Sequence, residues 1–150
     1  MNLKFETNFT VMPKHCNYMY PMIFGGHFFS EMDLCAACCV NRLLHDSECD
    51  SAVTHKFEGT FHAAAESGDL IFLQAEVIEL RTKAVVVSVK AFREKRAKPG
   101  RDFIAEAKFV FVTKKEGKYH PHGLKFPTDK SVKVTLDYEI DETDVRIVQR

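Results

Sequence analysis

The sequence predicts an α+β domain in which one long helix is wrapped by a curved antiparallel sheet. From about Gly26 to His45 the chain contains no proline and no further glycine, and a helix of that length would be about 30 Å long. Every residue from 34 to 40 is apolar, so this helix has no polar face there and needs to be surrounded. Several long strands joined by short turns follow it, and a sheet of such strands would supply the cover.

The strands are predicted from alternating apolar and polar residues and from the turn residues between them. A first strand is expected at residues 3–11, followed by an irregular loop over 12–26 that contains two prolines. After the helix, strands are expected at 52–63, 70–81, 83–95 and 103–115.

The strand predicted at 103–115 has the clearest alternation. The residues expected on its buried face are Phe103, Ala105, Ala107, Phe109 and Phe111. Residues 130–140 are expected to add a last strand, so that 128–150 form a C-terminal extension or an extra strand. Nothing in the chain divides it, and residues 1–150 are predicted to form a single domain.

The composition excludes several classes of function. Apolar residues make up 45% of the chain, and 21 basic residues balance 21 acidic ones, so a general binder of nucleic acid or of anionic membranes is not expected. No apolar run approaches the roughly 20 residues that span a bilayer. The N-terminal residues lack the apolar stretch of a signal peptide, and a cytoplasmic protein is expected.

Cysteine and histidine residues do not form a recognisable metal motif. The five cysteines are odd in number, and Cys35-x-x-Cys38 has no second ligand pair at zinc-finger spacing, so packing is the expected role of these thiols. The histidines of His120-Pro121-His122 fit a surface turn better than a metal site. No metal or redox cofactor is predicted.

Asp33 is the residue that most needs an explanation. It directly precedes the apolar run of the predicted helix. The residues that helical spacing places on its side are Phe29, Ala36, Ala37 and Val40. An ionised carboxylate is costly in such surroundings unless it is paired or takes part in chemistry. The pattern alone leaves open a structural role, in which Asp33 faces a solvent gap or accepts a hydrogen bond from a loop N–H.

The start of the helix is the second notable feature. Gly25 and Gly26 lack side chains, so a ligand oxygen could approach backbone N–H groups that have no partner within the helix. Asp33 lies seven residues after Gly26, two turns further along nearly the same face. An oxyanion donor beside a base or nucleophile is the minimum for acyl transfer. Alternatively, the glycines merely allow the tight entry of the chain.

These residues belong to a set that resembles the hotdog-fold acyl-CoA thioesterases. The set begins with Asn17, Phe24-Gly25-Gly26 and Asp33 in the pattern N-x(6)-F-G-G-x(6)-D, and Thr54 fits the start of the next strand. The run from Phe61 to Gly68-Asp69 and the segment 107–127 also fit. The resemblance covers roughly residues 8–127.

The resemblance implies a hotdog fold and a homodimer with active sites at the subunit interface, which could assemble further into tetramers or hexamers. Asp33 would act as general base or nucleophile. The Gly26 N–H would polarise the thioester carbonyl, and Asn17 would position water or substrate. Thr54 of the partner subunit would help to orient the water or the carboxylate.

The resemblance also implies how an acyl-CoA substrate would bind. Phe24 and Gly25 would contact the bound substrate at the start of the helix. Coenzyme A would enter as part of the substrate, with its phosphates near basic residues such as Arg93, Arg96 and Arg101. No separate cofactor would be needed.

Two departures from the family pattern keep other functions open. Met22 stands where one branch has an acidic residue, and there is one extra residue near Pro21. A non-catalytic acyl-CoA-binding or oligomerisation module is therefore an alternative. For the enzyme, Glu58 in the strand after Thr54 is a second candidate carboxylate if Asp33 is silent. A hotdog hydratase or dehydratase would want a His paired with the carboxylate in an Asp-x(4)-His pattern, and Asp33 has no His at that spacing. A serine hydrolase would want a G-x-S-x-G elbow, which it also lacks.

Overall fold

A computed structural model describes residues 2–124 and 133–134. It contains one α-helix, and the first and third of its strands alternate in burial. The elements are β1 (Lys4–Thr10), α1 (Gly25–Leu43), β2 (Ser51–Phe61), β3 (Leu70–Arg81), β4 (Ala84–Glu94), β5 (Asp102–Lys115), β6 (Lys118–Tyr119) and β7 (Lys133–Val134). Two short 3-10 turns, Pro13–His15 and Leu44–Asp46, precede and follow α1.

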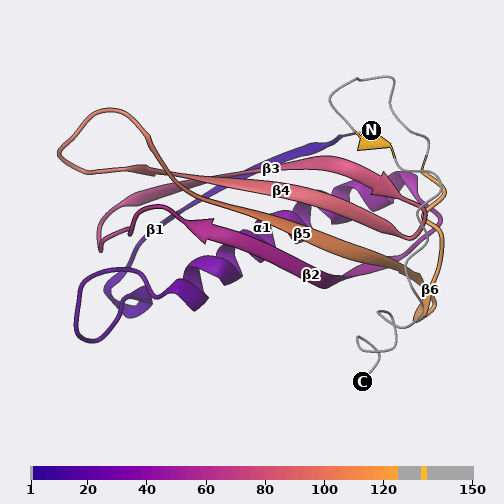
Figure 1. Ribbon diagram of the computed structural model, residues 1–150, viewed down its shortest axis with the longest axis horizontal. Helices are drawn as coiled ribbons and strands as arrows, with labels where there is room; N and C mark the ends of the chain where they lie inside the picture. Colours follow the sequence, from indigo (N-terminus) through magenta and orange to yellow (C-terminus); the bar gives the residue numbers. More distant parts are fainter. Residues whose placement is uncertain (1, 125–132, 135–150) are drawn as a thin grey trace.

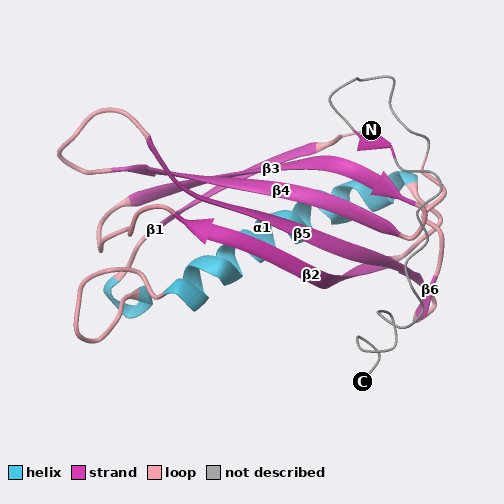
Figure 2. Cartoon of the chain, viewed as in Figure 1, coloured by secondary structure: helices cyan, strands magenta, loops and turns pink. Residues whose placement is uncertain are grey.

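The main strands form a strongly curled antiparallel sheet in the order β1-β3-β4-β5-β2. Helix α1 runs along one face of this sheet (Figures 1 and 2). Its buried residues recur every three or four positions, which makes one apolar stripe facing the sheet. They are Phe28, Met32, Cys35, Ala36, Cys39, Val40 and Leu43. The predicted fold class, one long helix wrapped by an antiparallel sheet, is confirmed.

The helix is less completely buried than predicted. It begins at Gly25 and ends at Leu43, and Leu34 in its middle is 60% exposed. The expectation that the apolar run is surrounded on every side is therefore wrong within a single chain. The sheet lies against only one side of α1, so an apolar side chain that points away from the sheet stays open to solvent.

A β-bulge changes the predicted burial at the start of β5. Ala91 and Phe92 of β4 are neighbours, but their partners Ala105 and Phe103 are two residues apart, so Ile104 is the extra residue. Ile104 is fully buried, whereas Phe103 is 42% exposed and packs on Phe92. The prediction that Phe103 belongs to the buried face is wrong because the bulge interrupts the alternation.

The chain after β5 folds back across the end of the sheet. His122 is buried, its Nε2–H donates to the carbonyl oxygen of Arg81, and its Nδ1 accepts from the Leu124 N–H at 3.1 Å. The expectation of a surface turn is wrong for this residue. Of the strand predicted at 130–140, Lys133–Val134 pair in parallel with Glu79–Leu80, and the rest lies outside the described residues.

No helix in the part of the chain that the structure describes is long and apolar enough to cross a membrane.

Candidate active site

The side chains of Asp33 and Thr54 meet between α1 and the sheet. The Thr54 hydroxyl donates a 2.8 Å hydrogen bond to Asp33 Oδ1, and both residues are partly buried. Asp33 therefore keeps one oxygen bonded to protein, and the residue is not fully buried. The structure places the Thr54 of the same chain on Asp33, and the expected contribution of Thr54 from a partner subunit stays a prediction.

A bulge in β2 brings Thr54 to the side of the sheet that faces the helix. The pairing of β2 with β5 shifts between Thr54 and Lys56, so His55 is an extra residue in the strand. Without this extra residue, Thr54 and Phe57 would lie on opposite faces, because they are three positions apart. With it, Thr54 reaches Asp33 while Phe57 packs against Phe29 of α1, with ring centroids 4.3 Å apart.

Aromatic side chains form a cluster one helical turn from the carboxylate. Phe29 lies one turn before Asp33 on α1, and its ring packs against Phe57 and Phe109 at centroid distances of 4.3 and 5.6 Å. Phe109 is buried, whereas Phe57 is 57% exposed.

The N-terminus of α1 provides free backbone donors. Phe24 is the N-cap residue, and no side chain caps the helix. The N–H groups of His27 and Phe28 bond to the Phe24 carbonyl, whereas no backbone partner is found for Gly25 or Gly26 among the described residues. Both glycines are exposed. A carbonyl oxygen that gains negative charge would be stabilised at this point by the N–H groups and by the helix dipole.

A cavity of about 390 Å³ opens beside these donors. Its walls come from the start of α1 and from the end of β2 with the loop after it. The residues that line it are Ile23, Gly25, Phe28, Phe61, His62, Ala63 and Ala64. The cavity is largely apolar, which suits an acyl chain or a pantetheine arm. Local sequence patterns do not indicate this cavity, because its walls come from segments more than thirty residues apart.

Asn17 lies in the loop before α1 and is exposed. Its N–H donates to Met22 O at 2.9 Å, and its Oδ1 accepts from the Met19 N–H at 3.0 Å. Within the described residues neither Asp33 nor Thr54 is its hydrogen-bond partner. The structure therefore brings Asp33 and Thr54 together, but it does not join Asn17 to them within one chain.

The three arginines expected to face coenzyme A have different surroundings. Arg93 donates to Ala64 O and forms an ion pair with Asp102 at 3.2 Å. The Arg101 guanidinium lies 3.5 Å from the centre of the Phe72 ring and 3.8 Å from Glu94. Arg96 is exposed in the β4–β5 loop, with no partner found among the described residues.

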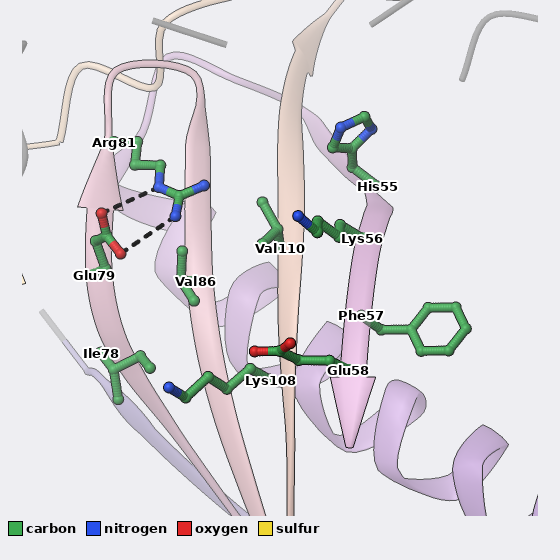
Figure 3. A pocket seen from close by; sticks show the side chains of 10 residues that line it. All are labelled: His55, Lys56, Phe57, Glu58, Ile78, Glu79, Arg81, Val86, Lys108 and Val110. Atoms are coloured by element: carbon green, nitrogen blue, oxygen red, sulfur yellow. Dashed lines mark hydrogen bonds and ion pairs between the residues drawn. The ribbon is translucent and has the colours of Figure 1, made fainter. Parts of the chain in front are cut away.

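A second cavity, of about 300 Å³, lies on the outer face of the sheet. Figure 3 shows Glu58 and Lys108 at this cavity, with Phe57 pointing away from it. Glu79 and Arg81 form an ion pair at its edge, 3.1 Å apart. Phe57 packs on α1, so Glu58, its neighbour in the strand, faces the opposite side of the sheet. Glu58 thus cannot replace Asp33 in the same site.

No group of three or more His, Cys, Asp or Glu side chains that could hold a metal ion occurs among residues 2–124 and 133–134. The thiols of Cys35 and Cys39 lie on the buried stripe of α1, and burial is the main cause that raises their pKa values to about 12 and about 11. They are packing residues, in keeping with the free state of all five cysteines.

A family model described as the thioesterase superfamily matches residues 20–100. No curated protein matches the chain.

Several solved structures share the fold. An acyl-CoA hydrolase from Staphylococcus aureus, solved with butyryl coenzyme A and coenzyme A, is 18% identical, with a TM-score of 0.72 over 97% of this chain and 82% of that chain. One from Bacillus cereus is 24% identical, with a TM-score of 0.71 over the same shares, 97% and 82%. A hexameric thioesterase from Yersinia pestis is 23% identical, with a TM-score of 0.69 over 81% and 94%. These likenesses confirm the hotdog fold.

Three further structures of the Staphylococcus aureus enzyme carry single alanine substitutions. The substituted residues are an asparagine, an aspartate and a threonine, in that order along its chain.

Proposed function

Because the chain belongs to the thioesterase superfamily, we propose that it is an acyl-CoA thioesterase, which hydrolyses an acyl-CoA thioester to a free acid and coenzyme A. The observation that carries the proposal is the hydrogen bond from Thr54 to Asp33, two turns into a helix whose first N–H groups are free. This arrangement supplies an oriented carboxylate and an oxyanion donor on one helix.

In the proposed reaction Asp33 acts as a general base. It takes a proton from a water molecule, whose oxygen bonds to the thioester carbon. The carbonyl oxygen becomes an oxyanion, which the N–H groups of Gly25 and Gly26 of the partner subunit would stabilise, because those of the same chain lie about 10 Å from Asp33 along the helix. Collapse of this intermediate breaks the carbon–sulfur bond, and the proton passes from Asp33 to the departing thiolate. Thr54 holds the carboxylate in place throughout.

The Staphylococcus aureus variants add support at the level of residue types. Asparagine, aspartate and threonine occur there in the same order as Asn17, Asp33 and Thr54 here. We infer that these three residues form one functional set in this chain. Asn17 would position the water or the thioester, from its own chain or from a partner.

A homodimer is part of the proposal. Strand β2 is an edge of the sheet and has no strand partner beyond β5 in the described chain. Phe57 and Phe61 of this edge are 57% and 52% exposed, and Phe24, the N-cap residue of α1, is 60% exposed. Pairing the β2 edges of two copies would satisfy their free backbone groups and cover these rings. Sedimentation analysis tests this: a monomer at micromolar concentration would refute the dimer.

Binding of the coenzyme A phosphates is assigned first to Arg96. Arg93 and Arg101 already have acidic or aromatic partners, whereas Arg96 lies in an exposed loop with Lys95 and Lys98 nearby in sequence. An exposed guanidinium can form bidentate bonds to phosphate. Arg96→Gln is expected to raise KM for acyl-CoA and to leave kcat nearly unchanged. An unchanged KM would remove Arg96 from the substrate site.

The test of the function is hydrolysis of short, medium, long and aromatic acyl-CoAs, followed by detection of the free thiol. Asp33→Asn keeps the shape of the side chain and removes the base, so kcat should fall at least about a hundredfold. Glu58→Gln is the matched control, because Glu58 lies on the other face of the sheet, and it should keep wild-type activity.

Each outcome has a distinct meaning. If Asp33→Asn retains full activity, Asp33 is a structural residue and the mechanism is wrong. If the wild type binds acyl-CoA but releases no thiol from any member of the panel, the chain is a binding module rather than a thioesterase.

A further inference from the structure

Two histidines are stacked where the loop before α1 meets the helix. The rings of His15 and His27 have centroids 4.0 Å apart and an interplanar angle of 12°. His15 ends the 3-10 turn that precedes the Asn17 loop, and His27 lies in the first turn of α1, next to Gly26. The ring of Phe9 in β1 makes an edge contact with His27, with ring centroids 6.2 Å apart. The stack thus joins the segments that carry Asn17 and the helix donors.

The hydrogen bonds of His15 require a neutral ring. Its Nδ1 accepts a hydrogen bond from the Met12 N–H at 3.1 Å, so this nitrogen carries no proton. Its backbone carbonyl accepts from the N–H of Phe24, the N-cap residue of α1, at 2.8 Å. Protonation of His15 at Nδ1 would set its new N–H against the Met12 N–H. The 3-10 turn Pro13–His15, which presents the His15 carbonyl to Phe24, would then be broken.

The charges around His15 favour the neutral ring. Its pKa lies below the ordinary value, first because the packed imidazole is partly withdrawn from water and then because protonated His27 and Lys14 would repel a positive charge. Glu31 acts in the opposite sense; it lies one turn after His27, with 3.5 Å between His27 Nε2 and Glu31 Oε1. Lys14, His27 and Glu31 are the charged groups that face His15.

We propose that His15 is a positioning residue for the thioesterase site: its neutral ring holds the Asn17 loop on the first turn of α1, and acid releases the loop. This inference rests on the proposed function only for its effect on catalysis. The release itself is a property of the fold and has its own measurement. It predicts that the enzyme loses its ordered helix entrance under mildly acidic conditions, while the core remains folded.

The first measurement is hydrogen exchange in peptides that cover residues 12–28, from pH 8 to pH 5, corrected for the intrinsic exchange rate. The wild type should lose about tenfold in protection on acidification, the cost of roughly one hydrogen bond. In His15→Asn the amide oxygen can replace Nδ1 as acceptor for Met12, and no titrating group remains at position 15, so protection should not vary with pH as it does in the wild type. Protection that is independent of pH in the wild type would overturn the proposal.

Lys14→Glu provides a second test that leaves His15 in place. The substitution replaces a charge that opposes protonation of His15 by one that favours it, so the loss of protection should move to higher pH. His27→Phe keeps an aromatic ring in the stack and removes the charge of protonated His27, which also opposes protonation of His15. The loss of protection should again move to higher pH. A transition that stays at the wild-type pH in both variants would assign the release to another group.

The pH profile of kcat/KM then connects the release to catalysis. Its acid limb should move with the exchange transition in Lys14→Glu, since Lys14 lies outside the proposed catalytic set. An acid limb that stays fixed while the exchange transition moves would show that His15 does not position the reacting groups. Absence of hydrolysis at every pH, with the exchange transition intact, would refute the proposed function and leave the acid-released contact established.

Discussion

Thr54 Oγ1 and Asp33 Oδ1 are 2.8 Å apart, although 21 residues separate them in the chain. The contact depends on two independent features. Asp33 lies just before the apolar run of α1, and the bulge at His55 turns Thr54 toward the helix while Phe57 still packs on Phe29. A hydroxyl that donates to a carboxylate restricts its rotation and occupies one of its oxygens. The other oxygen is left for water or substrate.

Removal of the Thr54 hydroxyl should lower activity more than it lowers stability. Thr54→Val keeps the shape and loses a charge-assisted hydrogen bond worth about 1.5–3 kcal/mol. If the whole free energy of this hydrogen bond serves to orient Asp33 in the transition state, its loss lowers kcat/KM roughly 10- to 100-fold. Thr54→Ser should retain most of the activity because it keeps the hydroxyl. Steady-state hydrolysis of the best acyl-CoA substrate measures both variants.

Thr60→Val is the control for this pair. Thr60 is an exposed residue of the same strand and pairs with Glu106 on the outer face of the sheet. Its hydroxyl has no role in the proposed site, so the variant should match the wild type. Equal losses in Thr54→Val and Thr60→Val would mean that β2 is merely sensitive to β-branched aliphatic residues.

Gly59 is required by the close approach of β2 to β5. A Cβ built on Gly59 would lie 2.9 Å from Ala107 Cβ and 2.9 Å from the Glu106 carbonyl oxygen. Because one of these atoms belongs to the backbone, a strand shift is needed, and Gly59→Ala should lower the free energy of unfolding by about 1–3 kcal/mol. Denaturant unfolding measures this.

Gly25→Ala provides the comparison. Its Cβ would meet Phe61 Cε2 at 3.5 Å, an ordinary contact, so its free energy of unfolding should stay within about 1 kcal/mol of the wild type. If Gly59→Ala were as stable as Gly25→Ala, the strands could separate at no cost and the steric argument would be wrong.

The sequence predicted the fold class and the long helix because both depend on patterns local to the chain. The apolar run of α1 and the alternation in β3 and β5 were sufficient for that. Burial at Phe103 and Ile104 could not be predicted, because a bulge changes the face of every residue beyond it without leaving a mark in the composition. The exposure of Leu34 was missed for a different reason: apolarity indicates that a side chain needs cover, but it does not say whether its own chain supplies it.

The same distinction applies to the site. Asp33 stood out because a carboxylate beside an apolar run is anomalous in any fold. The cavity next to Gly25 depends on Phe61 and Ala63, which only the path of the sheet brings to the helix. Tertiary geometry also decides that Thr54 of the same chain contacts Asp33 and that Glu58 does not.

Alkylation of the native protein should distinguish the cysteines of α1. Burial raises the pKa of Cys35 to about 12 and that of Cys39 to about 11, so almost no thiolate of either exists near pH 8. Both should resist iodoacetamide until the protein is unfolded, as peptide mass spectrometry would show. Rapid labelling of Cys35 in the native state would mean that α1 separates readily from the sheet.

His122 should make the stability of the fold depend on pH. Burial is the main cause that holds the pKa of His122 below 6.5, and its hydrogen bonds to the Arg81 and Ala84 backbone act in the opposite sense. The unfolded chain therefore takes up the proton at a higher pH than the folded one does. The contribution of neutral His122 is fully present above about pH 6.5 and is lost as the pH falls through the folded-state pKa.

Urea unfolding at a series of pH values from 8 to 5 tests this assignment. His122→Gln should be less stable than the wild type near pH 8, because the hydrogen bonds of the imidazole to Arg81 and Leu124 are lost. The stability of this variant should vary less with pH. His45→Gln, at an exposed position, should retain the wild-type pH dependence. A wild-type slope that persists in His122→Gln would place the acid sensitivity elsewhere, and the stacked pair of His15 and His27 would be the next group to test. The two sources can be separated, because protonation of His122 acts on global unfolding, whereas protonation of His15 should first affect the local exchange of residues 12–28.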